Sequence, residues 1–283
     1  MIAGPDLNSP STHMKIALDE GHYLMNQLYA FLGALNYEFR MQIRRRSVWI
    51  TFIALGLLFT QFHQPWYRPI TTPAGEAMIY WTQEMHSLLA IDVGILLADR
   101  LPRDRRTRVE ELLATFPGAL GARLGGKYIG STLATLIPLL GVYSVGVSYI
   151  LYRWHTLQAL PLALAAFAAI VLPGILFVSA FSLAFPALLW VPLYQFLFVG
   201  YWFWGNLLPG IGFLTLSDTI LTPVGGYMCT GFFNSGHREG VCSVGIEGAT
   251  ATQGVESILL LLGMALLALL AAWAFLRWEQ ARQ

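Results

Sequence analysis

Between Arg153 and Asp218 the chain reads WHTLQALPLALAAFAAIVLPGILFVSAFSLAFPALLWVPLYQFLFVGYWFWGNLLPGIGFLTLS, without a single Asp, Glu, Lys or Arg. A stretch of this length cannot form the core of a water-soluble domain, because about 25% of the residues in such a domain are charged. Over all 283 residues the charged fraction is 12% and the hydrophobic fraction is 56%. The apolar stretches are continuous rather than alternating, which is typical of membrane-spanning helices. The sequence therefore predicts an all-α integral membrane protein.

The composition also excludes several classes of protein. A formal net charge of +1 creates no field that would attract the phosphates of a nucleic acid, so no nucleic-acid partner is expected. The hydrophobic content excludes a disordered chain, and two cysteines are too few for a disulfide scaffold. The six histidines and two cysteines show none of the spacings of a metal site.

Six segments have the roughly 20 mostly apolar residues that a helix needs to cross the hydrocarbon core of a bilayer. These predicted spans are residues 47–64, 77–98, 127–152, 160–181, 188–207 and 257–276, and they define a six-helix transmembrane domain over residues 47–276. Pro186 and Pro192 stand where a break between the fourth and fifth spans is needed, and Pro173 interrupts the fourth.

The distribution of positive charge predicts the topology. With six spans and the N-terminus inside the cell, fourteen of the seventeen Lys and Arg residues are cytoplasmic, and Arg68, Arg153 and Arg238 are outside. This agrees with the positive-inside rule and favours an even number of spans. Residues 1–27 lack the apolar core of a signal peptide and are interpreted as a cytoplasmic tail, as are residues 277–283.

Residues 28–46 predict an amphipathic helix before the first span, because apolar side chains recur at helical spacing and arginines gather at the far end. The apolar positions are Leu28, Leu32, Leu35, Phe39 and Ile43, and the arginines are Arg40, Arg44, Arg45 and Arg46. We expect this helix to lie in the inner membrane interface with its arginines on lipid phosphates. The alternative is a helix packed on a soluble domain.

Residues 104–116 predict a second helix outside the membrane, which begins at Asp104 and ends before Pro117 and Gly118. Four arginines within residues 103–108 and two following glutamates give it more charge than a connector between spans needs. We therefore expect this helix to make a contact of its own. The alternative is a basic helix that faces lipid and only fixes the topology.

Residues 206–256 form a large predicted exterior segment that is rich in Gly, Thr and Ser. Its apolar stretches are too short to cross the membrane and suit re-entrant or interfacial pieces. Cys229 and Cys242 lie in this segment, where an oxidising environment is compatible with a disulfide, and two free cysteines are the alternative.

Two further patterns concern possible sites. Residues 121–127 match G-x-x-x-x-G-K, but Tyr128 stands where a phosphate loop has Ser or Thr, so we expect a helix that crosses the interface and no ATP site. In the second predicted span, Asp92 is costly to bury and lies nearly on the same helical face as Asp99. Asp92 either lines a polar path or is hydrogen-bonded in helix packing, whereas Glu84 and His86 are expected to reach the interface.

The order of these features resembles the six-span permeases of type-2 ABC transporters, most of which are exporters. The resemblance rests on four stretches and on the amphipathic helix and large exterior segment. The stretches are Ala98-Asp99-Arg100, Arg103-Asp104-Arg105, Glu111-Leu112-Leu113-Ala114-Thr115-Phe116-Pro117 and Gly126-Lys127.

This resemblance implies that residues 104–116 are a coupling helix, which docks on a separate ABC ATPase subunit. The implied contacts come from Arg105, Arg106, Arg108, Glu110, Glu111, Leu112 and Leu113. ATP and Mg²⁺ would be bound by the ATPase subunits, and this chain would not itself be an enzyme. A second permease copy, identical or related, would complete an exporter of the bacterial cytoplasmic membrane that works by alternating access. The alternatives are a secondary transporter or channel that uses Asp92, and a membrane enzyme, for which no catalytic pattern is seen.

Overall fold

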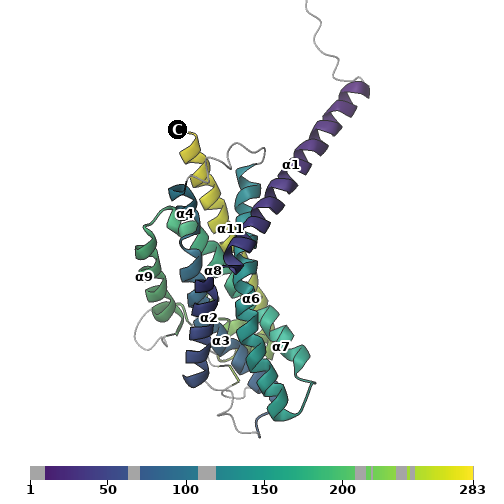
Figure 1. Ribbon diagram of the computed structural model, residues 1–283. Coiled ribbons are helices and arrows are strands. Elements are labelled where there is room, and N and C mark those ends of the chain that lie inside the picture. Colours follow the sequence, from purple (N-terminus) through teal and green to yellow (C-terminus); the bar gives the residue numbers. More distant parts are fainter. Residues whose placement is uncertain are drawn as a thin grey trace, which may run out of the picture.

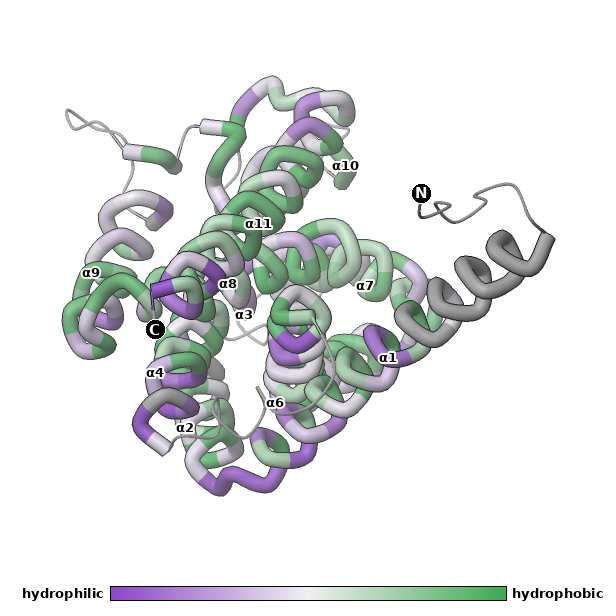
Figure 2. Tube along the Cα trace, turned by 90° about the horizontal axis from the view of Figure 1, so that it is seen from above, coloured by the Kyte–Doolittle hydropathy of each residue, from purple (hydrophilic) through white to green (hydrophobic). Residues whose placement is uncertain are grey.

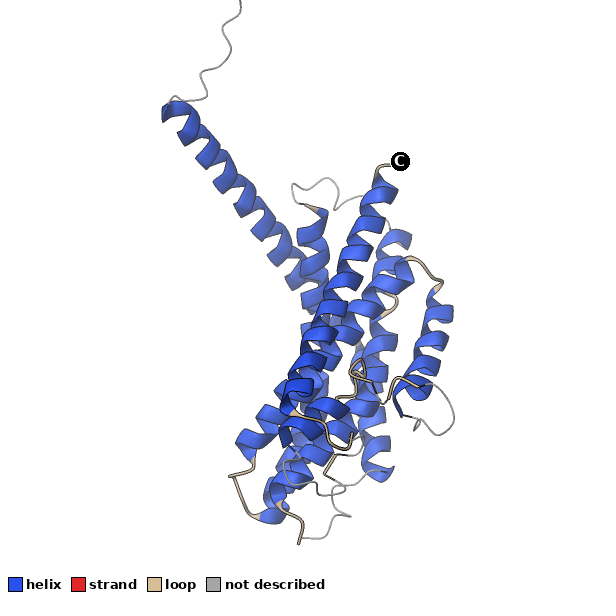
Figure 3. Cartoon of the chain, turned by 180° about the vertical axis from the view of Figure 1, so that it is seen from behind, coloured by secondary structure: helices blue, strands red, loops and turns tan. Residues whose placement is uncertain are grey.

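We analysed a computed structural model that describes residues 10–62, 71–107, 119–207, 215–217, 219–233, 241–242 and 246–282. The regular elements in these ranges are all helices, as Figure 3 shows, which confirms the prediction of an all-helical protein. Most of the helices run side by side in an elongated bundle, and α1 projects obliquely from one end of it (Figure 1).

The boundaries of the elements can be followed along the chain in Figure 1. In chain order they are α1 (Pro10–Ile43), α2 (Arg46–Phe62), α3 (Ala74–Leu97), α4 (Arg100–Arg106), α6 (Leu120–Trp154), α7 (Leu160–Ala166), the π-helical turn η2 (Phe167–Val171), α8 (Leu172–Ala184), the 3₁₀ turn η3 (Phe185–Ala187), α9 (Val191–Trp202), the π-helical turn η4 (Phe203–Leu207), α10 (Gly226–Phe233) and α11 (Ala251–Gln280).

Helices occupy all six positions predicted for spans, but they differ in length and apolarity. In the described part of the chain, three are long and apolar enough to cross a membrane: α6, the run from α7 to η3 (Leu160–Ala187), and α11. The apolar part of α2 is shorter, and α3 and α9 do not meet these criteria. Three candidate spanning helices indicate a membrane protein.

The position of α3 explains why it is too polar to qualify. It packs against α2, α6, α7, α8 and α9, and Figure 2 shows it between these helices. Its polar side chains Thr82, Gln83 and Ser87 are therefore buried against protein. Polar residues are tolerated at membrane depth when they face the interior of a helix bundle.

Proline shapes the run from α7 to η3 as the sequence predicts. Pro173 cannot donate a backbone hydrogen bond, and the helix widens into a π-helical turn just before it, where the N–H of Leu172 donates to the carbonyl of Phe167. Pro186 lies in the 3₁₀ turn that ends this run, and Pro192 lies in the first turn of α9. The predicted break between the fourth and fifth helical segments is confirmed.

The helix α1 packs along α6 through two glycines. A Cβ atom at Gly126 would lie 3.0 Å from the Cβ of Ala34, and one at Gly130 would lie 3.0 Å from the Cα of Leu35. This Gly-x-x-x-Gly spacing lets the two backbones approach closely. Residues 121–127 are accordingly part of the continuous helix α6 and do not form a loop.

The predicted boundaries of the amphipathic helix are wrong at its N-terminal end. The helix α1 begins at Pro10 rather than at Leu28, so residues 10–27, which were predicted as a tail, are helical. Leu28 and Leu32 are exposed, and the buried face of α1 contains Glu38 and Gln42. Only part of the apolar stripe seen in the sequence therefore packs against the bundle: Leu35 contacts α6, whereas Leu28 and Leu32 do not face it.

The predicted start of the second helix outside the membrane is also wrong. Here α3 ends at Leu97 and α4 begins at Arg100, so Asp104 lies inside α4 rather than at its start. Asp99 lies between the two helices and consequently does not share a helical face with Asp92. Most of the predicted coupling helix, residues 108–116, lies outside the described residues.

At the other end of the bundle, α10 packs against α11. Cys229 in α10 is joined to Cys242 by a disulfide. The first turn of α11 is closed by a capping box, in which the hydroxyl of Thr250 accepts from the N–H of Gln253 and the Gln253 side chain accepts from the N–H of Thr250. The hydroxyl of Ser257 donates to the carbonyl of Ile220, which ties this end of α11 to the segment before α10.

Candidate functional site

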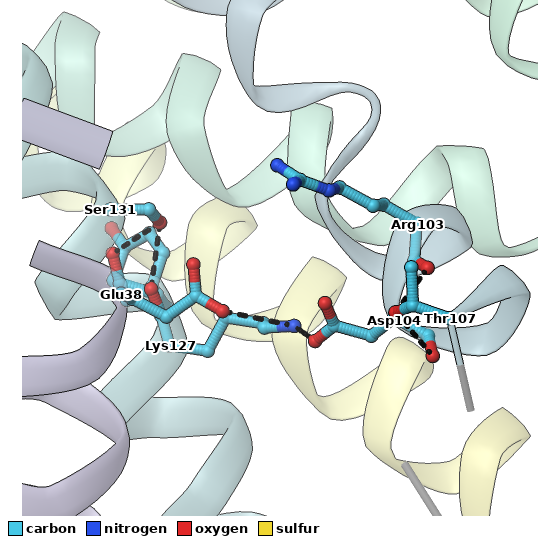
Figure 4. Close-up of polar contacts among 7 residues, drawn as sticks. Glu38, Arg103, Asp104, Thr107, Lys127 and Ser131 are labelled. Atoms are coloured by element: carbon cyan, nitrogen blue, oxygen red, sulfur yellow. Dashed lines mark hydrogen bonds and ion pairs between the residues drawn. The ribbon is translucent and has the colours of Figure 1, made fainter. Parts of the chain in front are cut away.

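A buried ion cluster joins three helices at the α4 end of the bundle. Lys127 of α6 lies between Glu38 of α1 and Asp104 of α4 (Figure 4). Its ammonium is 3.2 Å from a carboxylate oxygen of Glu38 and also donates to Asp104. Glu38 is 2% exposed and Lys127 is 8% exposed. We call these three residues the Lys127 cluster.

The local sequence explains why the Lys127 cluster forms. Lys127 lies between Gly126 and Gly130, where α1 and α6 approach each other most closely. One helical turn beyond the contact of Leu35 with Gly130, α1 presents Glu38 to the ammonium of Lys127. The side chain of Lys127 therefore pairs with carboxylates inside the bundle.

Arg100, the first residue of α4, lies close to the Lys127 cluster and is 1% exposed. Burial, together with the positive charge of Arg45, lowers the pKa of Arg100 to about 10, so it remains a cation at neutral pH. Burial and the charge of Arg103 likewise lower the pKa of Arg45. Within the described part of the structure, none of the three guanidinium nitrogens of Arg100 has a hydrogen-bond partner.

The Lys127 cluster lines a cavity of about 230 Å³ between α1, α4, α6 and the end of α11. Most of the cavity wall is apolar, and its charged lining residues are Glu38, Asp104, Arg123 and Lys127. The buried Nε atom of Arg123 has no partner among the described residues. The described part of the chain brings together no group of three or more His, Cys, Asp and Glu side chains that could hold a metal.

The residues predicted to contact an ATPase are only partly described. Arg105 and Arg106 lie in α4, and Arg106 forms a 4.0 Å ion pair with Asp99, in which its side chain is 65% exposed. The other predicted contacts lie outside the described residues: Arg108, Glu110, Glu111, Leu112 and Leu113. The described end of the predicted docking segment thus exposes Arg106.

The predicted path residue Asp92 is buried in the bundle, with 4% of its surface exposed. Thr51 of α2 lies within hydrogen-bonding reach of its carboxyl group, and one carboxyl oxygen has no partner in the described ranges. His86 does not reach the interface, because its ring is fully buried and its Nε2 atom bonds to the carbonyl of Pro223 at 2.9 Å.

The four arginines of the predicted interfacial helix lie at the junction of α1 and α2. Arg40, Arg44 and Arg46 are exposed, whereas Arg45 is only partly exposed and turns toward Arg100. Trp49 is exposed beside them, and its indole donates to the carbonyl of Ile43 at 2.8 Å.

Comparison with known proteins gives no match: no family model, no curated protein and no solved structure is similar to this chain. Arguments about function therefore depend on the residues themselves.

Sequence reasoning missed Glu38, Gln42 and Arg100 as members of a site. The available signal was the helical register of α1, in which Glu38 and Gln42 follow Phe31, Ala34 and Leu35 on one face. Two polar residues that continue a packed face predict a buried polar partner on the neighbouring helix. Nothing in the sequence around Arg100 distinguishes it from the other arginines of residues 100–108.

Proposed function

We propose that this chain is the membrane-spanning permease subunit of an ATP-driven ABC transporter. In this proposal it has six spans, both termini lie in the cytoplasm of a bacterial cell, and a second permease copy and two ABC ATPase subunits complete the assembly. The proposal is supported by the resemblance given by residues 98–127 and by the helical bundle with three candidate spanning helices.

The Lys127 cluster is the observation that carries the proposal. A permease must pass a movement of its coupling helix to its spanning helices. Asp104 belongs to the segment that would dock on the ATPase, and its carboxylate is bound by Lys127 of α6, which also binds Glu38 of α1. A force applied at residues 104–116 would thus act directly on α6 and α1, because the ion pairs are buried and packed.

Co-purification with a candidate ATPase tests this function. We expect the tagged permease to retain the ATPase, and the permease variant Arg108→Glu with Glu111→Lys to lose it, because charged contacts determine the partner and register of such interfaces. Glu279→Lys, which changes a charge on α11, is the matched control and should retain the ATPase. Absence of the ATPase from the wild-type preparation, or retention by the reversed variant, would count against the proposal.

The six-span topology has its own test. In this proposal Arg106 faces the cytoplasm and Leu157, which is 75% exposed between α6 and α7, faces the outside. Single cysteines at the two positions should therefore react from opposite sides of sealed cells with a thiol reagent that cannot cross the membrane. Labelling of both positions from the same side would contradict this arrangement.

One observation favours a second candidate function, a secondary transporter or channel. Asp92 is buried in α3, which packs against several other helices, and it has a carboxyl oxygen without a partner among the described residues. Intramembrane carboxyl groups often mark ion or proton pathways. Transport into liposomes by the chain alone, without ATP, and its loss in Asp92→Asn would favour this function over the permease.

A further inference from the structure

Arg100 is a buried cation without a bound counter-ion among the residues that the structure describes. Its side chain is 1% exposed, and Nε, Nη1 and Nη2 all lack hydrogen-bond partners in the described structure. Burying a charge without pairing it is costly, and an arginine cannot relieve the cost by losing its proton at neutral pH. The guanidinium group of Arg100 can therefore donate hydrogen bonds to a bound anion.

The surroundings of Arg100 add further unused donors. Gln42 of α1 is fully buried, and both its amide nitrogen and its amide oxygen lack partners among the described residues. Arg103, one turn along α4, has a buried Nη1 atom that also lacks a hydrogen-bond partner among the described residues. Together with Arg100 these residues offer five nitrogen atoms that can donate. Gln42 lies one helical turn after Glu38 and three residues before Arg45, and the charges of Glu38, Arg45 and Arg103 all act on Arg100.

The carboxylates near Arg100 do not neutralise this region. Five cations lie there against three carboxylates, which leaves an excess of two positive charges. The cations are Arg45, Arg100, Arg103, Arg106 and Lys127, and the carboxylates are Glu38, Asp99 and Asp104. Glu38 and Asp104 are bound by Lys127, and Asp99 pairs with Arg106, so each carboxylate already has a cation.

We propose that Arg100, Arg103, Gln42 and Arg45 form a binding site for a phosphate group. Guanidinium groups bind phosphate oxygens through paired, charge-assisted hydrogen bonds, and phosphate offers enough acceptors for donors that converge from two helices. Arg45 and Arg103 are partly exposed, so they connect the buried Arg100 to the surface. The proposal of this site does not depend on the proposed ATPase partner.

The phosphate can come from the headgroup of an anionic lipid or from free phosphate in solution. Both sources are compatible with the position of Arg45 between α1 and α2. The exposed apolar residues Ile50 and Ile53 of α2 suit contact with lipid, and the exposed Arg44 and Arg46 also suit a phosphate ion from solution. The chemistry of recognition is the same in both cases, and the two sources are separated by experiment.

The test uses the full chain purified in a sugar-based detergent, which carries no phosphate. Its thermal unfolding midpoint is followed while inorganic phosphate, phosphatidylglycerol or a phosphate-free glycolipid with the same acyl chains is added. We expect phosphate or phosphatidylglycerol to raise the midpoint of the wild-type chain, and the glycolipid to leave it unchanged. A response to phosphate identifies a soluble ligand, and a response to phosphatidylglycerol alone identifies a lipid headgroup.

Arg100→Gln should weaken this binding by at least about tenfold, because it removes the central charged donors. Arg282→Gln, at an exposed position after the end of α11 and outside this set of charges, is the matched control and should bind like the wild type. If Arg100→Gln does not fold, the partly exposed Arg103→Gln replaces it, with an expected weakening of at least about threefold. The proposal is overturned if neither probe stabilises the wild type, or if the folded variant responds as strongly as the wild type does.

Discussion

The ammonium of Lys127 in α6 lies 3.2 Å from the carboxylate of Glu38 in α1, and the same ammonium also binds Asp104 in α4. One buried cation therefore holds a buried carboxylate, that of Glu38, and a partly buried one, that of Asp104, from different helices. Pairs of this kind contribute little net stability compared with apolar packing, but losing one member leaves the others charged and unpaired. The arrangement makes the positions of α1, α4 and α6 depend on one another.

Replacing Lys127 by methionine should destabilise the protein strongly. The change keeps most of the apolar stem but leaves Glu38 and Asp104 without their cation, at an expected cost of about 3–5 kcal/mol. Adding Glu38→Gln to Lys127→Met should recover part of the loss, because it removes one unpaired charge. The thermal unfolding midpoint in detergent measures both effects.

The exposed pair of Arg106 and Asp99 gives the matched control for this experiment. Arg106→Met removes a surface ion pair and should change stability by only about 0–1 kcal/mol. A loss in Arg106→Met equal to that in Lys127→Met would show that burial of the Lys127 cluster is not what makes it important.

Close packing between α1 and α6 should be sensitive to a single methyl group. In Gly130→Ala the new Cβ would meet the backbone of Leu35, 3.0 Å from its Cα atom, and backbone cannot move aside as a side chain can. We expect a loss of about 1–3 kcal/mol and faster proteolysis within α1. In Gly141→Ala, on the same helix, no atom lies within 4 Å of the new Cβ, so stability should stay the same or rise by up to about 1 kcal/mol. Equal behaviour of the two variants would argue against the observed packing of α1.

These two contacts show how far the sequence could predict the fold. The six helical segments and the break at Pro186 and Pro192 follow from apolar length and from proline chemistry, which are local properties. The polarity of α3 follows from its central position, which depends on how the other helices surround it. The sequence shows the polar residues of α3, but it does not show that other helices surround them.

The candidate site was harder to predict, because its members are far apart in the sequence. Glu38, Asp104 and Lys127 meet only because Gly126 and Gly130 admit α1, and because α4 begins at Arg100 directly after α3. The acidic residue Asp104 has the usual signature of a helix start, but its carboxylate binds Lys127 instead. An acidic residue is typical of the first turn of a helix, but the position of Asp104 is explained by its tertiary contact with Lys127.

The disulfide between Cys229 and Cys242 should stabilise the α10 end of the bundle. The two cysteines are 13 residues apart, and a bridge that closes a loop of about 15 residues is worth about 3 kcal/mol. We expect a reducing agent to lower the unfolding midpoint of the wild type to that of the double variant Cys229→Ser with Cys242→Ser. The same agent should not affect the double variant, which has no cysteine left. Two reactive thiols in the unreduced native protein would contradict the bridge.

Asp92→Asn should leave the unfolding midpoint unchanged or raise it. The carboxyl group is 4% exposed, and one of its oxygens has no partner in the described ranges, so an ionised Asp92 is poorly compensated where it lies. Asparagine has nearly the same shape, retains an oxygen that can accept from the hydroxyl of Thr51, and carries no charge. Asp99→Asn serves as the control, because Asp99 is partly exposed and paired with Arg106.

A midpoint that falls by several degrees in Asp92→Asn would show that the charged carboxylate is stabilised in the folded protein. Combined with ATP-independent transport by the wild type, such a fall would move the functional assignment from the permease toward a carrier in which Asp92 binds the transported ion.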